Sequence, residues 1–519
     1  MTPTTSLNNP PADLIAGRWI PIPGDEIRST NPARPGAEIW SGLPVPAHAG
    51  QALESARAAL PAWAAWTIDQ RVGVLRRYQE LAKSNAEEMA NLIAAETGKA
   101  MWECKGEAGL LAAKVDITLE EGPNTGRSRV TAYDVPLNET KSGRCWFRPH
   151  GVMSVIGPFN FPAHLPNGHI VPALLTGNTI VFKPSDKTPA VGQRLAELFQ
   201  QALEEAGAPE GVFNLVQGGA DIASHLVSSP EADGVLFTGS WPVGRKILEA
   251  NLDQPGKIIA LEMGGNNPAV VMPSADLHQA AVEIVRCAFN TTGQRCTSTR
   301  RAIIHASVAD RLISAIVRAA EAIAIGDPMS NEPVFMGPII TEQAREAVFA
   351  FEKRLAEHGG EVLLSARQVQ DPIEGDASGW YVSPSVVRVP RFDLDTDDCG
   401  CDEELFGPLL RIAVVGDLDE AIKQANATRY GLAASIFSQD PAETCRFLGE
   451  ARAGCVNVNC GTACASSKLP FGGLGWSGNH RPAGAFALDY TAIPIAGMIE
   501  TGDASTMAPG MTLERDWLA

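Results

Sequence analysis

One cysteine of the chain, Cys296, has the chemistry of a nucleophile. It lies in the stretch Asn290-Thr-Thr-Gly-Gln-Arg-Cys-Thr-Ser-Thr299, between a predicted helix and a predicted strand. Gly293 lets the chain turn tightly, and Arg295 with neighbouring backbone N–H groups is expected to lower the thiol pKa from its usual value of about 8.5. A thiolate attacks carbonyl carbons. Taken alone, however, this spacing favours a structural cysteine, because most cysteines are small buried hydrophobes.

Two polar residues have the types needed to assist such a nucleophile. Glu262 follows the apolar stretch 258–261 and precedes Gly264 and Gly265, so we expect it at the C-terminal end of a strand, facing a cleft. A carboxylate there can act as a general base on water. Asn160, in the run GPFNFP, can donate a hydrogen bond to a developing oxyanion. For each residue alone, a surface ion pair or a turn-satisfying Asn is the alternative interpretation.

Two segments that follow predicted strands have features of nucleotide binding. The turn Phe237-Thr-Gly-Ser-Trp-Pro-Val-Gly244 precedes a helix whose free N–H groups attract anions. It is not GxGxxG, and in isolation an ordinary strand–helix turn is the favoured interpretation. Lys183 and Asp186, in the run Lys-Pro-Ser-Asp, end another strand. An acid at that place can hydrogen-bond ribose hydroxyls and repel a 2′-phosphate, and a solvated loop pair is equally compatible with it.

The remaining cysteines do not predict a metal site. Cys399 with Cys401, and Cys460 with Cys464, are close enough in sequence to suggest one. No paired CxxC framework and no His-rich tract accompanies them, so zinc is not expected. We interpret five others as structural: Cys104, Cys145, Cys287, Cys445 and Cys455.

Composition limits the partners. The 519 residues contain 42 Lys and Arg against 60 Asp and Glu, a net charge of −18 that repels phosphate backbones, so no nucleic-acid partner is expected. The N-terminal stretch lacks the basic start and apolar run of a signal peptide, and ten cysteines are far below disulfide-scaffold density, so we expect a cytoplasmic protein. Residues 151–182 lack Asp, Glu, Lys and Arg, but their four prolines and several Asn and His residues exclude a membrane helix.

Alternating strands and helices must position these residues. We predict strands at 152–156, 178–183, 213–216, 235–237 and 258–261, with a helix capped by Thr188 between them. Further on, a helix over 276–290, a strand over 302–304 and a helix over 307–325 are expected. Residues 47–97 have helical periodicity, and 127–149 suit a hairpin or strand arm. This alternation predicts two parallel α/β lobes that meet near Glu262–Gly265, with a cleft between them.

The order of the motifs is more specific than any one of them. The chain resembles the NAD(P)-dependent aldehyde dehydrogenase superfamily, whose motifs occur here in the family's order and with the family's spacing between Glu262 and Cys296. The resemblance covers the chain from about position 13 to position 500. It rests on GPFNFP at 157–162, FKPS at 182–185, FTGSxxxG at 237–244, LEMGG at 261–265, GQRC at 293–296, EELFGP at 403–408 and PFGG at 470–473.

The resemblance implies an α/β fold with two Rossmann-type lobes and a small β oligomerisation arm. It assigns 1–130 and 150–262 to an NAD-binding domain, 263–484 to a catalytic domain, 131–149 with 485–500 to the arm, and 501–519 to a C-terminal tail. The arm would pair subunits, as edge strands need a partner, which implies a homodimer or homotetramer. The implied catalytic residues are Cys296 as nucleophile, Glu262 as base and Asn160 as oxyanion donor. The implied cofactor residues are Lys183, Ser185, Asp186, Gly239, Ser240, Trp241, Pro242, Val243, Gly244, Glu404 and Phe406.

A narrower resemblance concerns the substrate. The stretches 164–185, LEMGGNNP at 261–268 and SGNHRP at 477–482 are similar to the family's N-succinylglutamate 5-semialdehyde dehydrogenases. The similarity implies oxidation of that semialdehyde to an acid through a cysteine thioester, with NAD rather than NADP because Asp186 is a carboxylate. Proposed substrate contacts are Thr297, Ser467, His480 and Arg481. The alternatives are another semialdehyde, transfer of the acyl group to CoA, or a catalytically silent nucleotide-binding scaffold.

Overall fold

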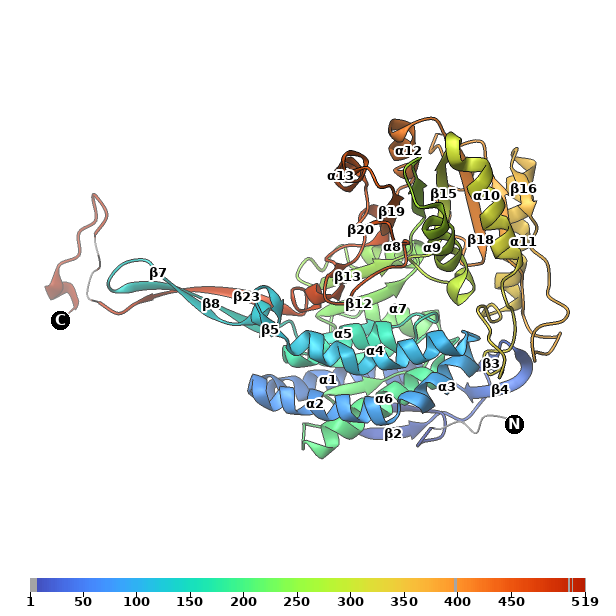
Figure 1. The fold of residues 1–519 in the computed structure, drawn as a ribbon. Coiled ribbons are helices and arrows are strands. Elements are labelled where there is room, and N and C mark those ends of the chain that lie inside the picture. The colour runs from blue at the N-terminus through green and yellow to red at the C-terminus, as the bar shows by residue number, and fades with distance from the viewer. Residues whose placement is uncertain (1–6, 396–398, 503–504, 506, 519) are drawn as a thin grey trace.

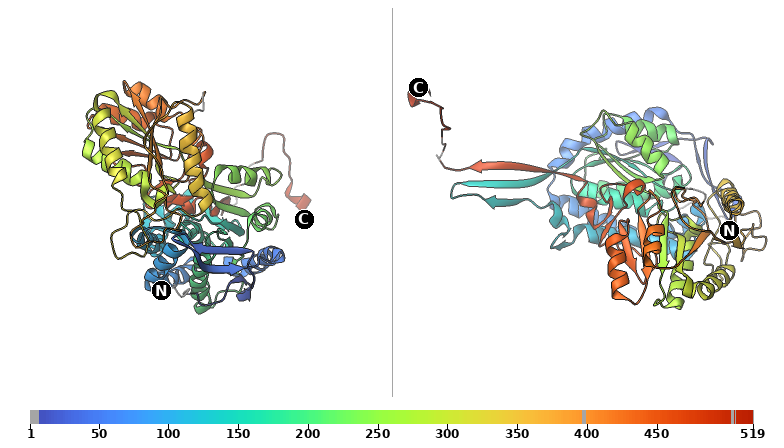
Figure 2. Two further views of the ribbon diagram at one scale, coloured as in Figure 1. Left: turned by 90° about the vertical axis from the view of Figure 1, so that its right-hand side faces the viewer. Right: turned by 90° about the horizontal axis from the view of Figure 1, so that it is seen from above.

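The computed structural model describes residues 7–395, 399–502, 505 and 507–518. The predictions for the extreme N-terminus and for the C-terminal tail therefore fall partly outside the described residues. The chain forms two lobes, one above the other in Figure 1, and a long β arm that projects from the body. The last described residues lie beyond the tip of the arm, as the turned views of Figure 2 also show.

The first lobe is built on a seven-stranded sheet. Its order is β13 (Ile258–Met263), β12 (Gly234–Gly239), β9 (Val152–Ile156), β10 (Thr179–Lys183), β11 (Phe213–Leu215), β1 (Ala12–Ile15) and β2 (Arg18–Pro21). The five strands from β13 to β11 are parallel, whereas β1 and β2 are antiparallel additions at one edge. The five predicted strands are therefore confirmed, and β12 and β13 each extend further than expected, to Gly239 and Met263.

Helices cover both faces of this sheet. Alternate strand residues point to opposite faces, so Val155 packs with the helices of one side and Val152 with those of the other. One face is covered by α1 (Pro46–Ala65), α7 (Ala220–Ser228) and α8 (Trp241–Glu249). The opposite face carries α2 (Ile68–Ser84), α3 (Ala86–Thr97), α4 (Met101–Leu119), α5 (His164–Leu175) and α6 (Pro189–Glu205). Residues 151–182 form β9, α5 and β10, and no helix within the described ranges has the length and apolarity needed to cross a bilayer.

The start of α6 differs from the prediction. Thr188 stands at the N-cap position, but its hydroxyl makes no capping hydrogen bond. The buried carboxylate of Glu96 accepts hydrogen bonds from the backbone N–H groups of Ala190 and Val191 instead, at 3.0 and 2.9 Å. A residue far away in sequence has thus taken the role that the local pattern assigned to Thr188, because a carboxylate satisfies helix N–H groups and interacts favourably with the helix dipole.

The second lobe has a similar architecture. Its sheet runs β16 (Glu361–Leu364), β17 (Ser385–Arg388), β18 (Leu409–Val415), β15 (Thr299–His305), β14 (Asn267–Val271), β19 (Ala433–Phe437) and β20 (Cys455–Val458), and only β16 is antiparallel to its neighbour. On one face lie α9 (Leu277–Phe289) and α10 (Ala306–Glu321). On the other lie α11 (Glu342–Glu357), α12 (Leu418–Ala425) and α13 (Pro441–Glu450). The helix predicted to run to residue 325 ends at Glu321.

The arm is a three-stranded antiparallel sheet in the order β23 (Ala492–Glu500), β8 (Lys141–Pro149) and β7 (Tyr133–Pro136). The hairpin expected within 127–149 is therefore present. Residues 485–488 form a 3₁₀ turn that packs into the core of the first lobe, so the arm's last strand begins only at Ala492. The remaining strands are β3 (Ile27–Asn31), β4 (Arg34–Gly42), β5 (Glu121–Gly122), β6 (Thr125–Gly126), β21 (Pro470–Phe471) and β22 (Ala483–Gly484).

Candidate active site

The register of the first sheet brings four parts of the chain together at the carboxyl-terminal ends of its parallel strands. Lys183 pairs with Ile156, Phe237 also pairs with Ile156, and Gly239 pairs with Met263. Since these strands are parallel, the segments that follow them leave the sheet at the same edge. They contain the GPFNFP run, the KPSD run and the glycine-rich turn, and Glu262 lies at the same end of the sheet as the residue before the last of β13.

The cysteine loop approaches this edge from the second lobe. Between α9 and β15, Thr291 and Thr292 have left-handed backbone angles, with φ of 51° and 55°, followed by Gly293 with φ of 70°. A Cβ atom at Gly293 would lie 2.1 Å from the Gly407 carbonyl oxygen, so the predicted tight turn requires glycine. The turn places Cys296, which is half-buried, where its side chain interacts with Glu262 of the first lobe.

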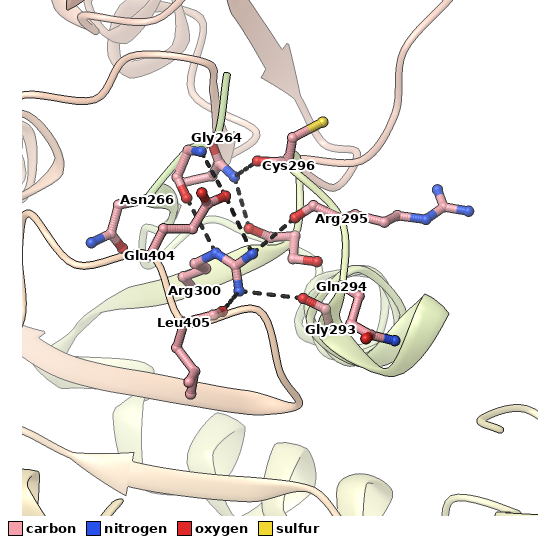
Figure 3. A network of polar contacts seen from close by, with 12 residues as sticks. Gly264, Asn266, Gly293, Gln294, Arg295, Cys296, Arg300, Glu404 and Leu405 are labelled. Atoms are coloured by element: carbon pink, nitrogen blue, oxygen red, sulfur yellow. Dashed lines mark hydrogen bonds and ion pairs between the residues drawn. The ribbon is translucent and has the colours of Figure 1, made fainter. Parts of the chain in front are cut away.

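The Arg300 side chain holds this loop in place by hydrogen bonds to backbone carbonyl groups (Figure 3). The Arg300 guanidinium donates hydrogen bonds to the carbonyl oxygens of Gly265 at 3.1 Å, Gly293 at 3.3 Å and Arg295 at 2.9 Å, and also to that of Leu405. Asn267 adds a hydrogen bond from Nδ2 to the Cys296 carbonyl oxygen at 2.8 Å. The backbone on both sides of the thiol is therefore rigidly held, while the sulfur itself points away from Arg300 (Figure 3).

Glu262 and Cys296 come together across the two lobes. Glu262 is 1% exposed, and neither of its carboxylate oxygens has a hydrogen-bond partner among the described residues. Burial, and then repulsion by Glu404, raise the pKa of Glu262 to about 8, while its interaction with the Cys296 side chain opposes them. An unpartnered buried carboxyl group beside a thiol is costly for stability, and it is available to exchange protons with the thiol or with water.

The thiol pKa differs from the sequence-based expectation. Burial, followed by repulsion from Glu262 and Glu404, raises the pKa of Cys296 well above its usual value. Arg295 and Arg300 lower that pKa, as predicted for Arg295, but the two carboxylates and burial outweigh them. The sequence pattern revealed only the arginine, because one carboxylate lies far before the cysteine in the chain and the other far after it, and both become its neighbours only on folding.

Asn160 also lies against the cysteine loop. Its Nδ2 atom donates to the carbonyl oxygen of Gln294 at 2.9 Å, and its Oδ1 atom accepts from the Phe161 N–H at 3.1 Å. The amide is 5% exposed, and its NH₂ group has a second N–H to donate. Asn160 is thus brought next to the segment that carries the predicted nucleophile.

The glycine-rich turn begins a helix, as predicted. β12 ends at Gly239, and α8 starts at Trp241 with Pro242 in its first turn. The Ser240 side chain makes no capping hydrogen bond, so it leaves the first N–H groups of α8 to another acceptor. Gly244 packs tightly, since a Cβ atom there would be 2.2 Å from the Met263 sulfur, whereas Val243 is exposed.

The other predicted cofactor residues are divided between exposed and buried positions. The Lys183 ammonium donates to the carbonyl oxygens of Pro184 and Gly218 at 2.7 and 2.6 Å, and burial lowers its pKa to about 8. Ser185 and Asp186 follow at the surface, where Asp186 lines a cavity of about 210 Å³.

Glu404 and Phe406 reach the site from the second lobe. Glu404 accepts a hydrogen bond from the Gly265 N–H at 2.9 Å and lies 3.5 Å from Arg300. Burial raises the pKa of Glu404 to about 7. The Phe406 ring meets the Phe159 ring edge to face, with centroids 6.0 Å apart.

The four predicted substrate residues are more scattered. Thr297 is buried beside Cys296, and its carbonyl oxygen accepts from Thr462 Oγ1 at 2.7 Å. Ser467 is half-buried, and His480 is exposed. Arg481 donates to the Gly473 carbonyl oxygen at 2.5 Å and acts electrostatically on Cys455, which Glu262 also influences. Cys460 and Cys464 lie in the same loop as Ser467. In the described part of the chain, no three or more His, Cys, Asp or Glu side chains are grouped so that they could hold a metal ion.

Sequence reasoning missed the residue that supports the strand of Glu262. Asn479 accepts from the Leu261 N–H at 2.8 Å and donates to the Ile259 carbonyl oxygen at 3.0 Å through its side chain, while its own N–H donates to the Leu261 carbonyl oxygen. The neighbouring Ser477 hydroxyl donates to the Gly264 carbonyl oxygen at 2.6 Å. The SGN part of SGNHRP therefore completes the edge of β13, a role that no local sequence pattern reveals.

Trp476 is a second residue that sequence reasoning missed. Its ring stacks on Trp241 with centroids 5.1 Å apart and an interplanar angle of 9°, and it meets Tyr430 edge to face. This contact joins the start of α8 to the second lobe.

Comparisons with known proteins agree with this arrangement. Residues 19–493 match the aldehyde dehydrogenase family. An N-succinylglutamate 5-semialdehyde dehydrogenase of Caulobacter sp. (strain K31) is 44% identical over 491 residues, which cover 93% of this chain and 95% of that protein. A protein of the same name from Novosphingobium aromaticivorans is 42% identical, over 91% and 95% of the two chains.

Solved structures extend the similarity to three dimensions. An NAD-dependent aldehyde dehydrogenase from Sinorhizobium meliloti superposes with a TM-score of 0.88 at 28% identity, covering 97% of each chain. An NADP-dependent enzyme from E. coli has a TM-score of 0.86 at 30% identity, covering 95% of this chain and all of that one.

Proposed function

The chain belongs to the aldehyde dehydrogenase family, and from this premise we propose that it oxidises N-succinylglutamate 5-semialdehyde to the corresponding acid with NAD. The protein is an aldehyde-oxidising oxidoreductase that uses a nicotinamide cofactor. The particular substrate is supported by the names of relatives that are 41–44% identical over most of their length.

One observation carries the catalytic proposal. The carboxyl group of Glu262 and the thiol of Cys296 come from different lobes, influence each other's pKa, and leave both Glu262 oxygens without a partner among the described residues. A buried carboxyl group costs stability unless it is paired, so its placement beside the thiol is best explained by chemistry.

The reaction follows from these groups. The Cys296 thiol gives its proton to the Glu262 carboxylate, which passes it on to water, and the sulfur forms a bond to the aldehyde carbon while the carbonyl electron pair moves to the oxygen. The second N–H of the Asn160 amide and the Cys296 backbone N–H would hold the resulting oxyanion; losing one such donor typically lowers the rate about 100- to 1,000-fold. The carbon's C–H bond then breaks, its hydride leaves to the acceptor that a bound nicotinamide ring would supply, and the C=O bond re-forms, so that a thioester to Cys296 remains. Glu262 then takes a proton from water, whose oxygen attacks the thioester carbon, and the acid leaves as the thiolate is restored.

The residues at the carboxyl-terminal ends of the first sheet's strands fit a dinucleotide. The uncapped first turn of α8, over Ser240–Gly244, offers N–H groups to a pyrophosphate. Glu404 and Phe406 would contact the nicotinamide ribose and ring, while Lys183, Ser185 and Asp186 would contact the adenosine. We propose NAD rather than NADP because the exposed Asp186 carboxylate would repel a 2′-phosphate.

Residues next to Cys296, in the loop between β20 and β21, and in the segment between β21 and β22 would contact the rest of the substrate. Thr297 and Ser467 offer hydroxyl groups, and His480 and Arg481 offer donors to the succinyl carboxylate. The left-handed backbone of His480 and Arg481, with φ of 53° and 51°, is unusual for side chains of this kind and is often found at functional sites.

A second copy of the chain is the proposed partner. The arm exposes Tyr133, Val135, Leu137 and Met498, and among the described residues its two outer strands, β7 and β23, each pair on one side only. An exposed apolar edge strand favours pairing with another chain, so we expect a homodimer or homotetramer by light scattering on a sizing column.

The decisive experiment follows NADH absorbance with a panel of aldehydes. It compares kcat/KM for N-succinylglutamate 5-semialdehyde with glutamate, succinate and simple aliphatic semialdehydes, with NAD or NADP and with or without CoA. We expect the succinylated substrate with NAD to be best and CoA to have no effect. Cys296→Ala should abolish oxidation and retain cofactor binding.

The other outcomes identify the alternatives. A higher kcat/KM for another semialdehyde would replace the proposed substrate. A dependence on CoA would indicate acyl transfer to CoA. Cofactor binding without any oxidation would indicate a silent scaffold.

A further inference from the structure

Basic side chains gather around the ring of Phe161, the residue after the proposed oxyanion donor. Lys99 Nζ lies 3.8 Å from the ring centroid, and the Arg295 guanidinium carbon lies 4.9 Å from it. The His164 ring is edge-on to the same ring, with centroids 6.4 Å apart. Phe161 and His164 belong to the first lobe and Arg295 to the second, so this cluster forms where the lobes meet.

Lys99 does not offer its charge to a ligand. It forms an ion pair with Glu107, and both side chains are almost fully buried. Glu107 is also saturated, because its other oxygen accepts from the Ala163 and His164 N–H groups at 3.0 and 3.1 Å. This pair stabilises the start of α5, and Lys99 packs against one face of the Phe161 ring.

The described residues use only some of the N–H donors of the Arg295 guanidinium. Its Nε donates to Thr291 Oγ1 at 2.8 Å, and its Nη2 donates to Glu103 Oε1 at 2.9 Å. Its Nη1 makes no hydrogen bond with any part of the chain that the structure describes. The Arg295 side chain is 20% exposed, whereas Glu103 is fully buried and also holds Thr291. One edge of the guanidinium is therefore fixed by the protein and the other is open, a geometry suited to a carboxylate.

The direction of Arg295 agrees with this role. In Figure 3 its side chain extends away from Arg300 and Glu404, where the cofactor ribose is proposed to lie, and the Cys296 sulfur also points away from that network. Arg295 acts electrostatically on the Cys296 thiol and on His164.

His164 supplies an unsatisfied polar atom in the same cluster. Its Nδ1 is buried and has no hydrogen-bond partner within the described ranges. Burial, and then the nearby cations of Lys114, Lys99 and Arg295, lower the pKa of His164 to about 4, while Glu107 opposes them. At neutral pH the ring is uncharged and can donate one N–H to an acceptor.

The proposed substrate has two carboxylates at different distances from its aldehyde. The α-carboxylate is separated from the aldehyde carbon by three carbons, and the succinyl carboxylate lies beyond an amide. A guanidinium on the residue next to Cys296 is suited to the nearer group. We propose that Arg295, with His164 beside it, binds the α-carboxylate of the semialdehyde. This assignment rests on the proposed function and adds its α-carboxylate subsite.

Four aldehydes test the assignment. N-Succinylglutamate 5-semialdehyde has both carboxylates, 5-oxopentanoate keeps only the nearer one, 4-(succinylamino)butanal keeps only the farther one, and pentanal has neither. For Arg295→Gln we expect KM to rise at least about tenfold for the first two, through loss of a charge-assisted hydrogen bond. KM for the last two should stay within about twofold. His164→Leu should show the same pattern with a smaller rise, and Arg295→Lys should restore part of the loss.

The reaction with pentanal also distinguishes an effect of the substitution on carboxylate binding from an effect on the reactivity of the Cys296 thiol. Because Arg295 lowers the thiol pKa, Arg295→Gln can change kcat, but that change should be common to all four aldehydes. Arg446→Gln is the matched control, since Arg446 lies on α13, forms exposed ion pairs with Asp419 and Glu450, and is outside the proposed site. Its KM values should match those of the wild type.

Three results would overturn the assignment: an equal rise in KM for 4-(succinylamino)butanal, an equal rise for pentanal, or no rise for 5-oxopentanoate. The proposed function fails separately, if the wild type prefers another semialdehyde to the succinylated one. In that case the comparison of 5-oxopentanoate with pentanal still tests whether Arg295 binds a carboxylate at this distance.

Discussion

Gly264→Ala should disable the site through Glu404 alone. A Cβ atom at position 264 would lie 1.6 Å from Glu404 Oε2 and 2.4 Å from Oε1. Gly264 is not among the residues with positive φ, so alanine fits its backbone. The carboxylate must therefore move by about 1.5 Å or more to restore ordinary contact. It would lose the 2.9 Å hydrogen bond from the Gly265 N–H and the 3.5 Å contact with Arg300.

The magnitude follows from the proposed role of Glu404 on the cofactor ribose. A hydrogen bond to a charged group contributes about 1.5–3 kcal/mol. At about 1.4 kcal/mol for each factor of ten, its loss should lower kcat/KM for the cofactor roughly 10- to 100-fold. The assay is the initial rate of NADH formation at saturating aldehyde and varied NAD. Gly109→Ala, at a helix position with open space around it, should leave that rate unchanged.

A double-mutant cycle decides whether the effect acts through Glu404. If it does, adding Gly264→Ala to Glu404→Ala should cost almost nothing further, because the displaced group is already gone. The reasoning is refuted if the alanine at 264 lowers kcat/KM by the same factor in both backgrounds, or if Gly264→Ala alone binds and uses NAD normally.

The other predictions concern Glu262 and the strand that carries it. Glu262→Gln should release one burst of NADH per active subunit and then stall at the thioester, and steady turnover at the wild-type rate in stopped-flow traces would remove Glu262 as the base. With its pKa near 8, Glu262 is protonated at lower pH, so a hydrolysis-limited kcat should fall about tenfold per pH unit below 8; a flat profile from pH 6 to 8 would contradict this. Since its folded pKa lies above the unfolded value, Glu262 should also destabilise the fold increasingly as pH rises from about 4.5 to 8, and Glu262→Gln should gain in melting temperature over the wild type across that range. Asn479→Ala removes two side-chain hydrogen bonds from β13, so thermal or denaturant unfolding should show a loss of about 1–3 kcal/mol together with a lower kcat, and an unchanged stability would show that the strand edge does not need them.

The sequence predicted the elements of the fold well where the pattern was local. The five parallel strands of the first sheet are short apolar runs between turn residues, and each formed where the run predicted it. The helix over 276–290 was equally clear, because Asp276 caps it and accepts from the Gln279 N–H. The edge strands β1 and β2 and the cap of α6 were not predicted, since β1 pairs with β11 and α6 is capped by Glu96, and both partners are distant in the chain.

Local sequence by itself determined which residue types could do chemistry: a cysteine after a glycine turn, a glutamate at the end of a strand and an asparagine between phenylalanines. Only the tertiary structure decided their electrostatics. Cys296 is surrounded by Glu262 and Glu404 as well as Arg295, so burial and two carboxylates raise a pKa that the local sequence indicated would fall. Likewise, Arg300 and Asn479 hold the site through hydrogen bonds with backbone atoms. Such contacts leave no signal in the partner's sequence, because every residue type offers a backbone carbonyl group. The physical reason is that side-chain type is encoded locally, whereas a pKa or a strand edge depends on the groups that folding brings within a few ångströms.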